Sequence, residues 1–306
     1  MKKILFIIIT MGWISQEIHA QNDVQYTHFV FNKLAYNAAF AGNNEVLSVN
    51  ALYRHQWVNI QDAPKTFHIN AHMPFAGNRS GIGLSVTTDK IGLFQTNFVD
   101  LYYAYRIPLG GSTLAIGLNG RVEHGTFNYQ NAQGNDPGDI ALPDQNQSRF
   151  LPNFGAGIQV SNDRYFVGLS MNQFLNNHYY LSNNVNNTRD ITMKTIYLMG
   201  GVKFDLGEKV AFQPSVMVSH NPSAPLDVDV HAGFIFLDLI YTGFSYRLED
   251  SVDFLFMYQL TKQFRIGAAY DFILSDLSTK TPGSFEFFGQ YNFGFGHNQV
   301  KHIRYF

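Results

Sequence analysis

The fold of this chain is decided by one stretch of eight residues, Thr66-Phe67-His68-Ile69-Asn70-Ala71-His72-Met73. Its odd-numbered residues are apolar, and its even-numbered residues are polar. Because successive side chains of a β-strand point to opposite faces, the stretch predicts a strand with one apolar and one polar face. His68 and His72 share the polar face, roughly 13 Å apart at ~3.3 Å per residue. We therefore do not expect them to bind one metal ion together.

The same alternation recurs to the end of the chain. It predicts about fourteen strands, each close to the ~9–11 residues with which a tilted strand crosses a bilayer. The polar faces carry Arg, Asp, Glu, His and Gly, which suits a polar lumen, and Tyr and Phe cluster near strand ends as aromatic girdles would. The predicted strands are 45–57, 64–74, 80–88, 94–107, 113–127, 152–161, 164–172, 192–205, 208–219, 226–237, 239–247, 251–260, 262–272 and 284–295.

Composition narrows the class of protein. Of the 306 residues only 14 % are charged, where soluble domains have about a quarter. Beyond the N-terminus no stretch approaches the ~20 apolar residues of a membrane helix. The formal net charge of -2 argues against a basic nucleic-acid binder, and the lack of Cys excludes disulfide scaffolds, thiol catalysis and thiolate metal sites. A large soluble β protein or a membrane β-barrel remains.

The N-terminus predicts export. Lys2 and Lys3 precede a largely apolar stretch, 4–14, and Ile18-His19-Ala20 forms a cleavage site that ends in Ala. The apolar stretch is too short for a spanning anchor, and no Cys follows the site to make a lipoprotein. We expect a cleaved signal peptide over residues 1–20.

Connection lengths separate a barrel from a soluble sandwich. If both termini lie in the periplasm, short turns and long surface loops should alternate. The long gaps, 128–151, 173–191 and 273–283, all follow odd-numbered strands, whereas the tight turns at 108–111, 162–163 and 205–208 follow even-numbered ones. We therefore predict an all-β protein, a single-domain transmembrane outer-membrane β-barrel of about 14 antiparallel strands over residues 45–295.

Several motifs carry a family resemblance. They are Val24-Gln25-Tyr26-Thr27-His28-Phe29-Val30-Phe31-Asn32, Tyr36-Asn37-Ala38-Ala39-Phe40-Ala41-Gly42, Tyr53-Arg54-His55-Gln56-Trp57 and Ala63-Pro64-Lys65-Thr66, with weaker ones at 81–85, 89–92, 100–106, 151–158, 166–170 and 303–306. In order and spacing they resemble the PorP/SprF family, outer-membrane barrels of the type IX secretion and gliding-motility system of Bacteroidota. Lys33 and Ala38 stand where that family usually has proline. The motif residues are Gln25, Tyr26, Phe31, Asn32, Tyr36, Asn37, Ala41, Gly42, Tyr53, Arg54, Gln56, Trp57, Pro64 and Lys65.

The resemblance implies an interaction protein, not an enzyme. Family members help to secrete or anchor a partner at the cell surface, often an adhesin with a type IX C-terminal sorting domain. The implied partners are that substrate, the type IX machinery in the periplasm and outer membrane, and the lipid bilayer, with no nucleic acid and no cofactor. The alternatives are a transport barrel for small solutes and an outer-membrane hydrolase. Gly83-Leu84-Ser85 and Gly168-Leu169-Ser170 lack the closing Gly of a nucleophile elbow.

Three regions are candidate contact sites. Residues 21–44, rich in aromatic side chains, either plug the lumen or dock on the periplasmic rim; we favour the plug because a barrel of this width has room beyond its own side chains. Loops 128–151 and 173–191 are the candidate surface for a secreted partner, since surface loops on a rigid scaffold commonly carry recognition. The loop candidates are Asp136, Asp139, Asp144, Asn176, Tyr179 and Asn184.

The tail 296–306 is the third region. It either contacts secretion components in the periplasm or serves as an assembly signal, and its candidate residues are Lys301, Arg304, Tyr305 and Phe306. The acidic residues of loop 128–151 lack the fixed spacing of an EF-hand, so we expect a solvated loop and no metal. In the lumen, we expect a charge network of Asp227, Asp229 and Asp253 with Arg121 and Arg265.

Overall fold

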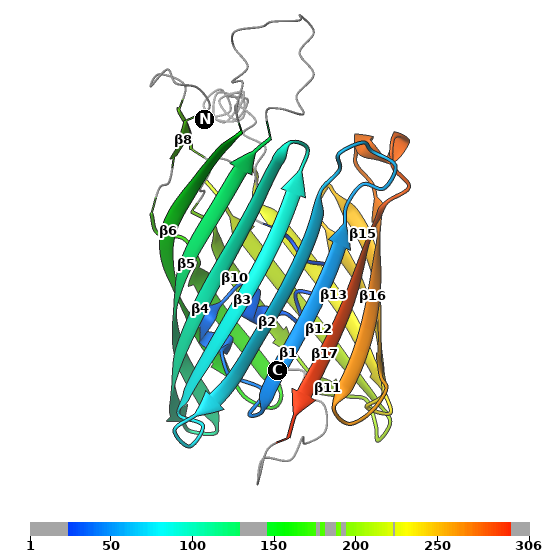
Figure 1. The fold of residues 1–306 in the computed structure, drawn as a ribbon. Helices are drawn as coiled ribbons and strands as arrows, with labels where there is room; N and C mark the ends of the chain where they lie inside the picture. Colours follow the sequence, from blue (N-terminus) through cyan, green and yellow to red (C-terminus); the bar gives the residue numbers. More distant parts are fainter. Residues whose placement is uncertain are drawn as a thin grey trace, which may run out of the picture.

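The computed structural model describes residues 24–128, 146–175, 178–180, 188–190, 194–222 and 224–294. These residues form one closed antiparallel barrel (Figure 1). Fifteen strands make fourteen positions around the barrel, because β10 and β11 pair in succession with the same strand, β12. The barrel closes where β1 pairs with β17.

The strands follow the chain order around the barrel. They are β1 (Leu47–His55), β2 (Lys65–Phe75), β3 (Ser80–Ile91), β4 (Phe94–Leu109), β5 (Ser112–Phe127), β6 (Gln147–Ser161), β7 (Tyr165–Met171), β10 (Ile196–Val202), β11 (Phe204–Asp205), β12 (Val210–His220), β13 (Asp227–Phe236), β14 (Ile240–Arg247), β15 (Ser251–Gln259), β16 (Phe264–Ile273) and β17 (Ser284–Phe293). A separate hairpin joins β8 (His178–Tyr180) to β9 (Thr188–Asp190), and the 3-10 turns are η1 (Lys33–Ala35), η2 (Ala38–Phe40) and η4 (Asp276–Thr279).

The predicted barrel is confirmed, with differences at strand ends. The predicted loop 128–151 is wrong at its end, because 147–151 belong to β6 and pair with β5. Strands β4, β5 and β6 have 16, 16 and 15 residues, more than the ~9–11 that a bilayer requires. Their ends extend past the apolar band, where a strand face need not be apolar, so the alternation no longer marks them. The β8–β9 hairpin was not predicted.

The connections differ in length between the two ends of the barrel as predicted, except that 92–93 and 248–250, which follow odd-numbered positions, are also short. Those after even-numbered barrel positions are short, namely 76–79, 110–111, 162–164, 206–209, 237–239 and 260–263. The longest connections, 128–146, 172–195 and 274–283, all lie at the other end, the upper end in Figure 1. Since outer-membrane barrels have short periplasmic turns and long extracellular loops, the upper end is the extracellular one.

The two faces of the wall differ in polarity. Large apolar side chains point outward and are more than half exposed, for example Leu101, Leu118, Val167, Phe244 and Phe287. Such a surface is costly in water, at about 25 cal/mol per Å², and stable against lipid chains. Polar side chains point inward and are buried. Among the described residues, no helix is both long and apolar enough to cross a bilayer.

Candidate functional site

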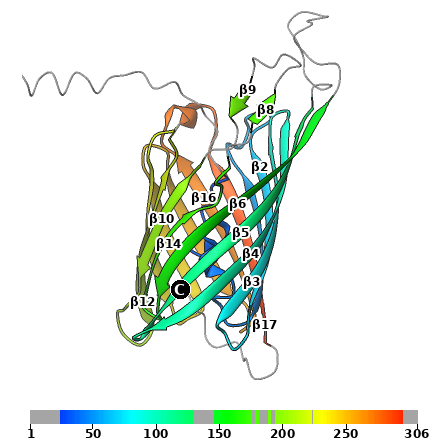
Figure 2. The same cartoon turned by 90° about the vertical axis from the view of Figure 1, so that its left-hand side faces the viewer.

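Residues 24–46, here called the plug segment, lie inside the barrel (Figure 2). Gln25 donates from Nε2 to Asp227 at the extracellular end of β13. At the other end of the plug segment, the Ala41 carbonyl accepts from Arg106 near the periplasmic end of β4. The plug segment therefore runs down the lumen and enters β1 at the periplasmic end. It lies in the lumen, not on the periplasmic rim.

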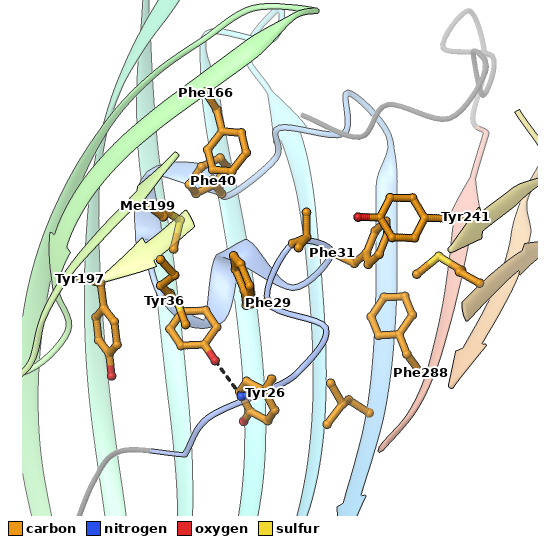
Figure 3. Packing of buried hydrophobic residues seen from close by; sticks show 14 of the residues in the cluster. Tyr26, Phe29, Phe31, Tyr36, Phe40, Phe166, Tyr197, Met199, Tyr241 and Phe288 are labelled. Carbon is orange, nitrogen blue, oxygen red and sulfur yellow. Dashed lines mark hydrogen bonds between the residues drawn. The ribbon is translucent and has the colours of Figure 1, made fainter. Parts of the chain in front are cut away.

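An aromatic cluster packs the plug segment against the wall (Figure 3). The ring of Phe31 meets Tyr241 of β14 edge-on, with centroids 4.7 Å apart. Tyr36 meets Tyr197 of β10 at 5.2 Å in the same way. Within the segment, the Tyr26 backbone N–H donates to the Tyr36 hydroxyl at 2.8 Å. Edge-on aromatic pairs contribute about 0.5–1.5 kcal/mol each beyond their buried area, so this cluster is a core for an otherwise polar lumen.

Two glycines let the plug segment approach the wall closely. A Cβ on Gly117 of β5 would lie 2.2 Å from the Ala39 backbone nitrogen. A Cβ on Gly157 of β6 would lie 2.1 Å from Oδ1 of Asn37. The Asn37 side chain accepts from the Ala39 N–H at 2.9 Å and donates to the Ile158 carbonyl at 3.1 Å. Any larger residue at either glycine would displace the segment, so this part of the wall is shaped to receive it.

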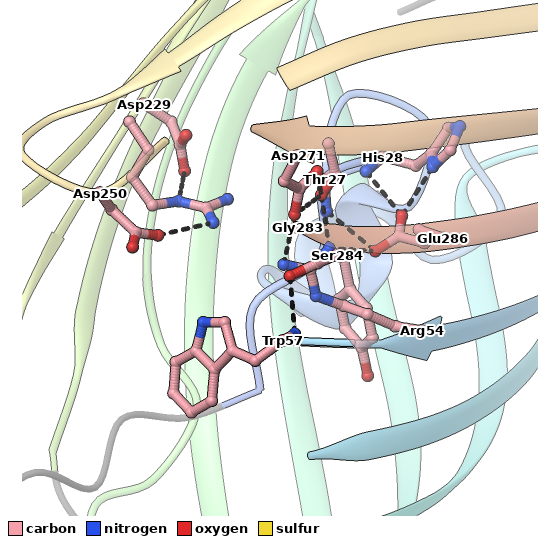
Figure 4. Close-up of polar contacts among 12 residues, drawn as sticks. Thr27, His28, Arg54, Trp57, Asp229, Asp250, Asp271, Gly283, Ser284 and Glu286 are labelled. Carbon is pink, nitrogen blue, oxygen red and sulfur yellow. Dashed lines mark hydrogen bonds and ion pairs between the residues drawn. The ribbon is translucent and has the colours of Figure 1, made fainter. Parts of the chain in front are cut away.

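A buried polar cluster holds the upper part of the plug segment (Figure 4). The Glu286 carboxylate accepts from the backbone N–H of Thr27 at 3.0 Å and of His28 at 2.8 Å, and His28 Nδ1 lies 2.6 Å from it. Arg54 donates to the Thr27 hydroxyl at 2.6 Å and to Asp271 at 2.7 Å. The hydroxyl of Thr27 donates in turn to Asp271 at 2.9 Å. All five residues are at most 1 % exposed, so each charge depends on its partners inside the protein.

A buried lysine occupies the middle of the plug segment. Lys33 Nζ lies 4.5 Å from the centroid of the Phe166 ring and 5.5 Å from that of Phe40. Burial, and to a lesser degree the charge of Arg265, lower the pKa of Lys33 to about 7. Lys33 therefore releases its proton more readily than a solvated lysine does.

Comparison with known proteins identifies the family. The model of the family "Type IX secretion system membrane protein PorP/SprF" matches residues 18–291. This chain belongs to the PorP/SprF family. The family and the barrel place it in the outer membrane as a component of the type IX secretion system. No curated protein sequence matches the chain.

Solved outer-membrane proteins share the barrel. Omp33 of Acinetobacter baumannii is 8 % identical, with 81 % of this chain and 98 % of that chain covered and a TM-score of 0.50. The toluene transporter TbuX of Ralstonia pickettii is 10 % identical, with 85 % and 93 % covered and a TM-score of 0.51. At these identities, the likeness shows the fold alone.

The PorP/SprF motif residues gather in two places. Eight lie in the plug segment: Gln25, Tyr26, Phe31, Asn32, Tyr36, Asn37, Ala41 and Gly42. Arg54 belongs to the buried polar cluster, whereas Tyr53 and Lys65 are exposed. The other three, Gln56, Trp57 and Pro64, lie in the extracellular connection 56–64.

The connection 56–64 is hydrogen-bonded to residues 281–284, which lead into β17. The backbone N–H of Trp57 donates to the Ser284 hydroxyl at 3.1 Å, and that of Val58 donates to the Gly283 carbonyl at 2.9 Å. The Thr281 hydroxyl donates back to the Val58 carbonyl at 2.7 Å. The PorP/SprF motifs thus fix the plug segment and one extracellular loop.

The lumen charges pair differently from the predicted network. Arg121 binds Asp100 at 2.7 Å, and Arg265 donates to Gln290 at 2.7 Å. Asp229 pairs with Arg247 at 3.2 Å. Asp227 binds the plug segment, and Asp253 lies opposite Asp271 across β15 and β16, although Asp229 interacts through its charge with both Asp227 and Asp253. Alternation tells which residues face the lumen but not their positions around it, which is why the predicted partners were wrong.

The two histidines of the stretch 66–73, His68 and His72, form hydrogen bonds inside the lumen. His68 Nδ1 lies 2.7 Å from the Thr87 hydroxyl, and its Nε2 lies 2.9 Å from the Asn70 side-chain nitrogen. His72 Nδ1 accepts from the Gly42 N–H at 2.9 Å. Among the described residues, no group of three His, Asp or Glu side chains could hold a metal ion.

Several predicted contact residues fall outside the described residues. They are Asp136, Asp139, Asp144, Asn176, Asn184, Lys301, Arg304, Tyr305 and Phe306, together with the leader 1–20. Tyr179 lies in β8. Residue patterns did not single out Glu286, Asp271, Gly117 or Gly157, although the two acids stood on polar strand faces.

Proposed function

We propose that this protein is a plugged outer-membrane scaffold that helps to secrete or anchor a partner protein at the cell surface. It acts by binding, and neither catalysis nor transport is its role. The observation that carries the proposal is the occupied lumen: residues 26–34 and 36–42 are all buried inside the barrel. A solute would have to cross the space that this packed segment fills.

The partner would meet the barrel at its two ends. On the extracellular side, the connections 128–146 and 172–195 are the longest, and the connection 56–64 lies at the same end of the barrel. An adhesin-like protein with a type IX C-terminal sorting domain is the proposed occupant. On the periplasmic side, the short turns and the tail 296–306 would meet the secretion machinery. The chain would reach this position after cleavage of the signal peptide 1–20.

Affinity purification tests this proposal. The tagged protein is purified from native outer membranes, and its partners are identified by mass spectrometry. We expect a large secreted adhesin or type IX machinery to be recovered. A matched variant, in which 128–146 is replaced by a Gly-Ser linker, should lose the secreted partner and keep the barrel. Recovery of the barrel alone, under solubilisation that preserves known complexes, would contradict the proposal.

A transport barrel for small solutes is the second candidate function. It is favoured by the shared barrel of TbuX, which is a toluene transporter. Single-channel conductance separates the two. A scaffold closed by the plug segment should conduct little until residues 24–43 are deleted, whereas a transporter should conduct or take up solute with the segment in place. Lipid hydrolysis by the purified protein would instead revive a catalytic role.

A further inference from the structure

The seam between β1 and β17 closes the barrel. Nine register pairs join the two strands, from Leu47 opposite Phe293 to His55 opposite Phe285. The strands come from opposite ends of the chain, so the seam forms only after both have been made. Before that, each presents a row of unpaired backbone groups, which is the usual liability of an edge strand.

The binding site for the plug segment is built from both sides of this seam. Glu286 of β17 accepts the backbone N–H groups of Thr27 and His28, whereas Arg54 of β1 donates to the Thr27 hydroxyl. Arg54 and Glu286 are register partners across the seam. With β17 unpaired, Arg54 would lose both carboxylates that neutralise it, Glu286 and Asp271. The complete site therefore exists only in the closed barrel, because a buried charge without its partners is costly.

The plug segment also makes apolar contacts with both seam strands, β1 and β17. The His28 ring stacks on Phe288 of β17 with centroids 5.5 Å apart, and Leu52 of β1 lies buried in the same cluster as Phe31. Further along the plug segment, Asn37 binds the carbonyls of β6 and β7. A docked plug segment thus ties both seam strands to a part of the wall that is separated from β1 by β2, β3, β4 and β5.

We propose that the plug segment is a latch for barrel closure. It docks only after β17 has paired with β1, and once docked it holds these two strands together. Its loss should loosen the seam more than the β4–β5 pair, which also contacts the plug segment but is joined by 16 register pairs of its own. The latch does not depend on which partner the protein binds, so it stands apart from the proposed function.

A single introduced thiol reports docking. The chain has no Cys, and Val30 in the plug segment is 1 % exposed, so the thiol of Val30→Cys should react with a water-soluble maleimide only when the segment leaves its site. Amide hydrogen exchange in β1 and β17, compared with β4 and β5, reports the seam.

The test variant is Thr27→Val, made in the Val30→Cys protein, which removes the hydroxyl that Arg54 and Asp271 share. We expect it to speed labelling of the introduced thiol and β1–β17 exchange by about tenfold or more, because hydrogen bonds to charged groups are worth at least one such factor. Exchange in β4 and β5 should accelerate less, because these strands keep their 16 register pairs although Arg106 and Gly117 contact the plug segment. The matched control is Thr66→Val, another buried threonine that donates to a carboxylate, Asp89 at 2.6 Å; it should change neither signal. Equal acceleration in all four strands, or labelling without faster β1–β17 exchange, would overturn the latch.

Refolding tests the order of events. The Val30→Cys protein is refolded from urea into detergent micelles, and samples are taken over time. The closed barrel is scored by its shift on an unheated gel, and docking by protection of the introduced thiol from maleimide. We expect protection to appear with the closed form or after it. Protection in samples that still lack the closed form would show that docking does not need the seam, and the proposal would fail.

Discussion

Arg54 and Glu286 face each other across the seam of the barrel, yet their closest charged atoms, Nη1 and Oε2, are 3.4 Å apart. Thr27 of the plug segment contacts both of these atoms. Thr27 gives its N–H to the same Oε2 at 3.0 Å and accepts from the same Nη1 at 2.6 Å. The ion pair is therefore bridged by a residue that lies outside the wall, and both of its charges make part of their hydrogen bonds to the plug segment.

Loss of the Glu286 charge should destabilise the barrel strongly. Glu286→Gln leaves the buried Arg54 guanidinium with one carboxylate fewer, and breaking a buried pair costs about 3 kcal/mol. Denaturant unfolding in micelles measures the change in the free energy of unfolding. Asp205→Asn is the comparison, because Asp205 is 60 % exposed in its pair with Lys203, and such pairs are worth no more than about 1 kcal/mol. Similar losses in the two variants would contradict the assigned role of Glu286.

Gly117→Val should open the lumen. Its Cβ would lie 2.2 Å from the Ala39 nitrogen, which is backbone and cannot rotate away. The plug segment must then move, and single-channel recordings in planar bilayers should show a conductance above that of the native protein. Gly120→Val lies on the same strand with open space around its Cβ, and it should leave the recordings unchanged. If the Gly117→Val protein shows no added conductance and melts at the native temperature, the plug segment adjusts to the valine without leaving the lumen.

The sequence predicted the strands of the barrel wall more accurately than the contacts of the plug segment inside the lumen. Alternation revealed which side chains face inward, because the bilayer imposes it on every spanning strand. It did not reveal the contacts of Thr27, because a plug has no period and its partners lie 244 and 259 residues away at Asp271 and Glu286. Glycines such as Gly117 looked like ordinary barrel glycines. Only the three-dimensional approach of the plug segment distinguishes it from Gly120 on the same strand.

Docking of the plug segment should tighten as the pH rises from 7 to 9. Burial lowers the pKa of Lys33 to about 7. In this range the undocked, solvated lysine holds its proton, with a pKa near ~10.4, and the docked one has released it, so stability rises with pH. The unfolding midpoint in denaturant, taken at several pH values, measures this. Lys33→Met should flatten the dependence; an unchanged slope in that variant would assign it to another group.

Asn37 and Gly157 should be energetically coupled. In the native protein, Gly157→Ala brings its Cβ to 2.1 Å from the Asn37 side chain, which also holds the Ala39 N–H and the Ile158 carbonyl. Asn37→Ala alone loses these hydrogen bonds, at about 1–2 kcal/mol, and leaves a void beside the glycine.

In the Asn37→Ala background, the two closest contacts of the Gly157→Ala methyl group are gone and only the Ser170 Cβ, at 3.0 Å, remains of the three nearest atoms, so the methyl group fills part of that void. The glycine substitution should therefore cost less there than in the native protein, with a coupling free energy of about 0.5–3 kcal/mol, as for residues in contact. Denaturant unfolding of the four proteins measures it. Gly120→Ala on β5, with no atom within 4 Å of its Cβ, should be additive with Asn37→Ala. If the effects of Asn37→Ala and Gly157→Ala on the free energy of unfolding were additive as well, Asn37 would not occupy the space above that glycine.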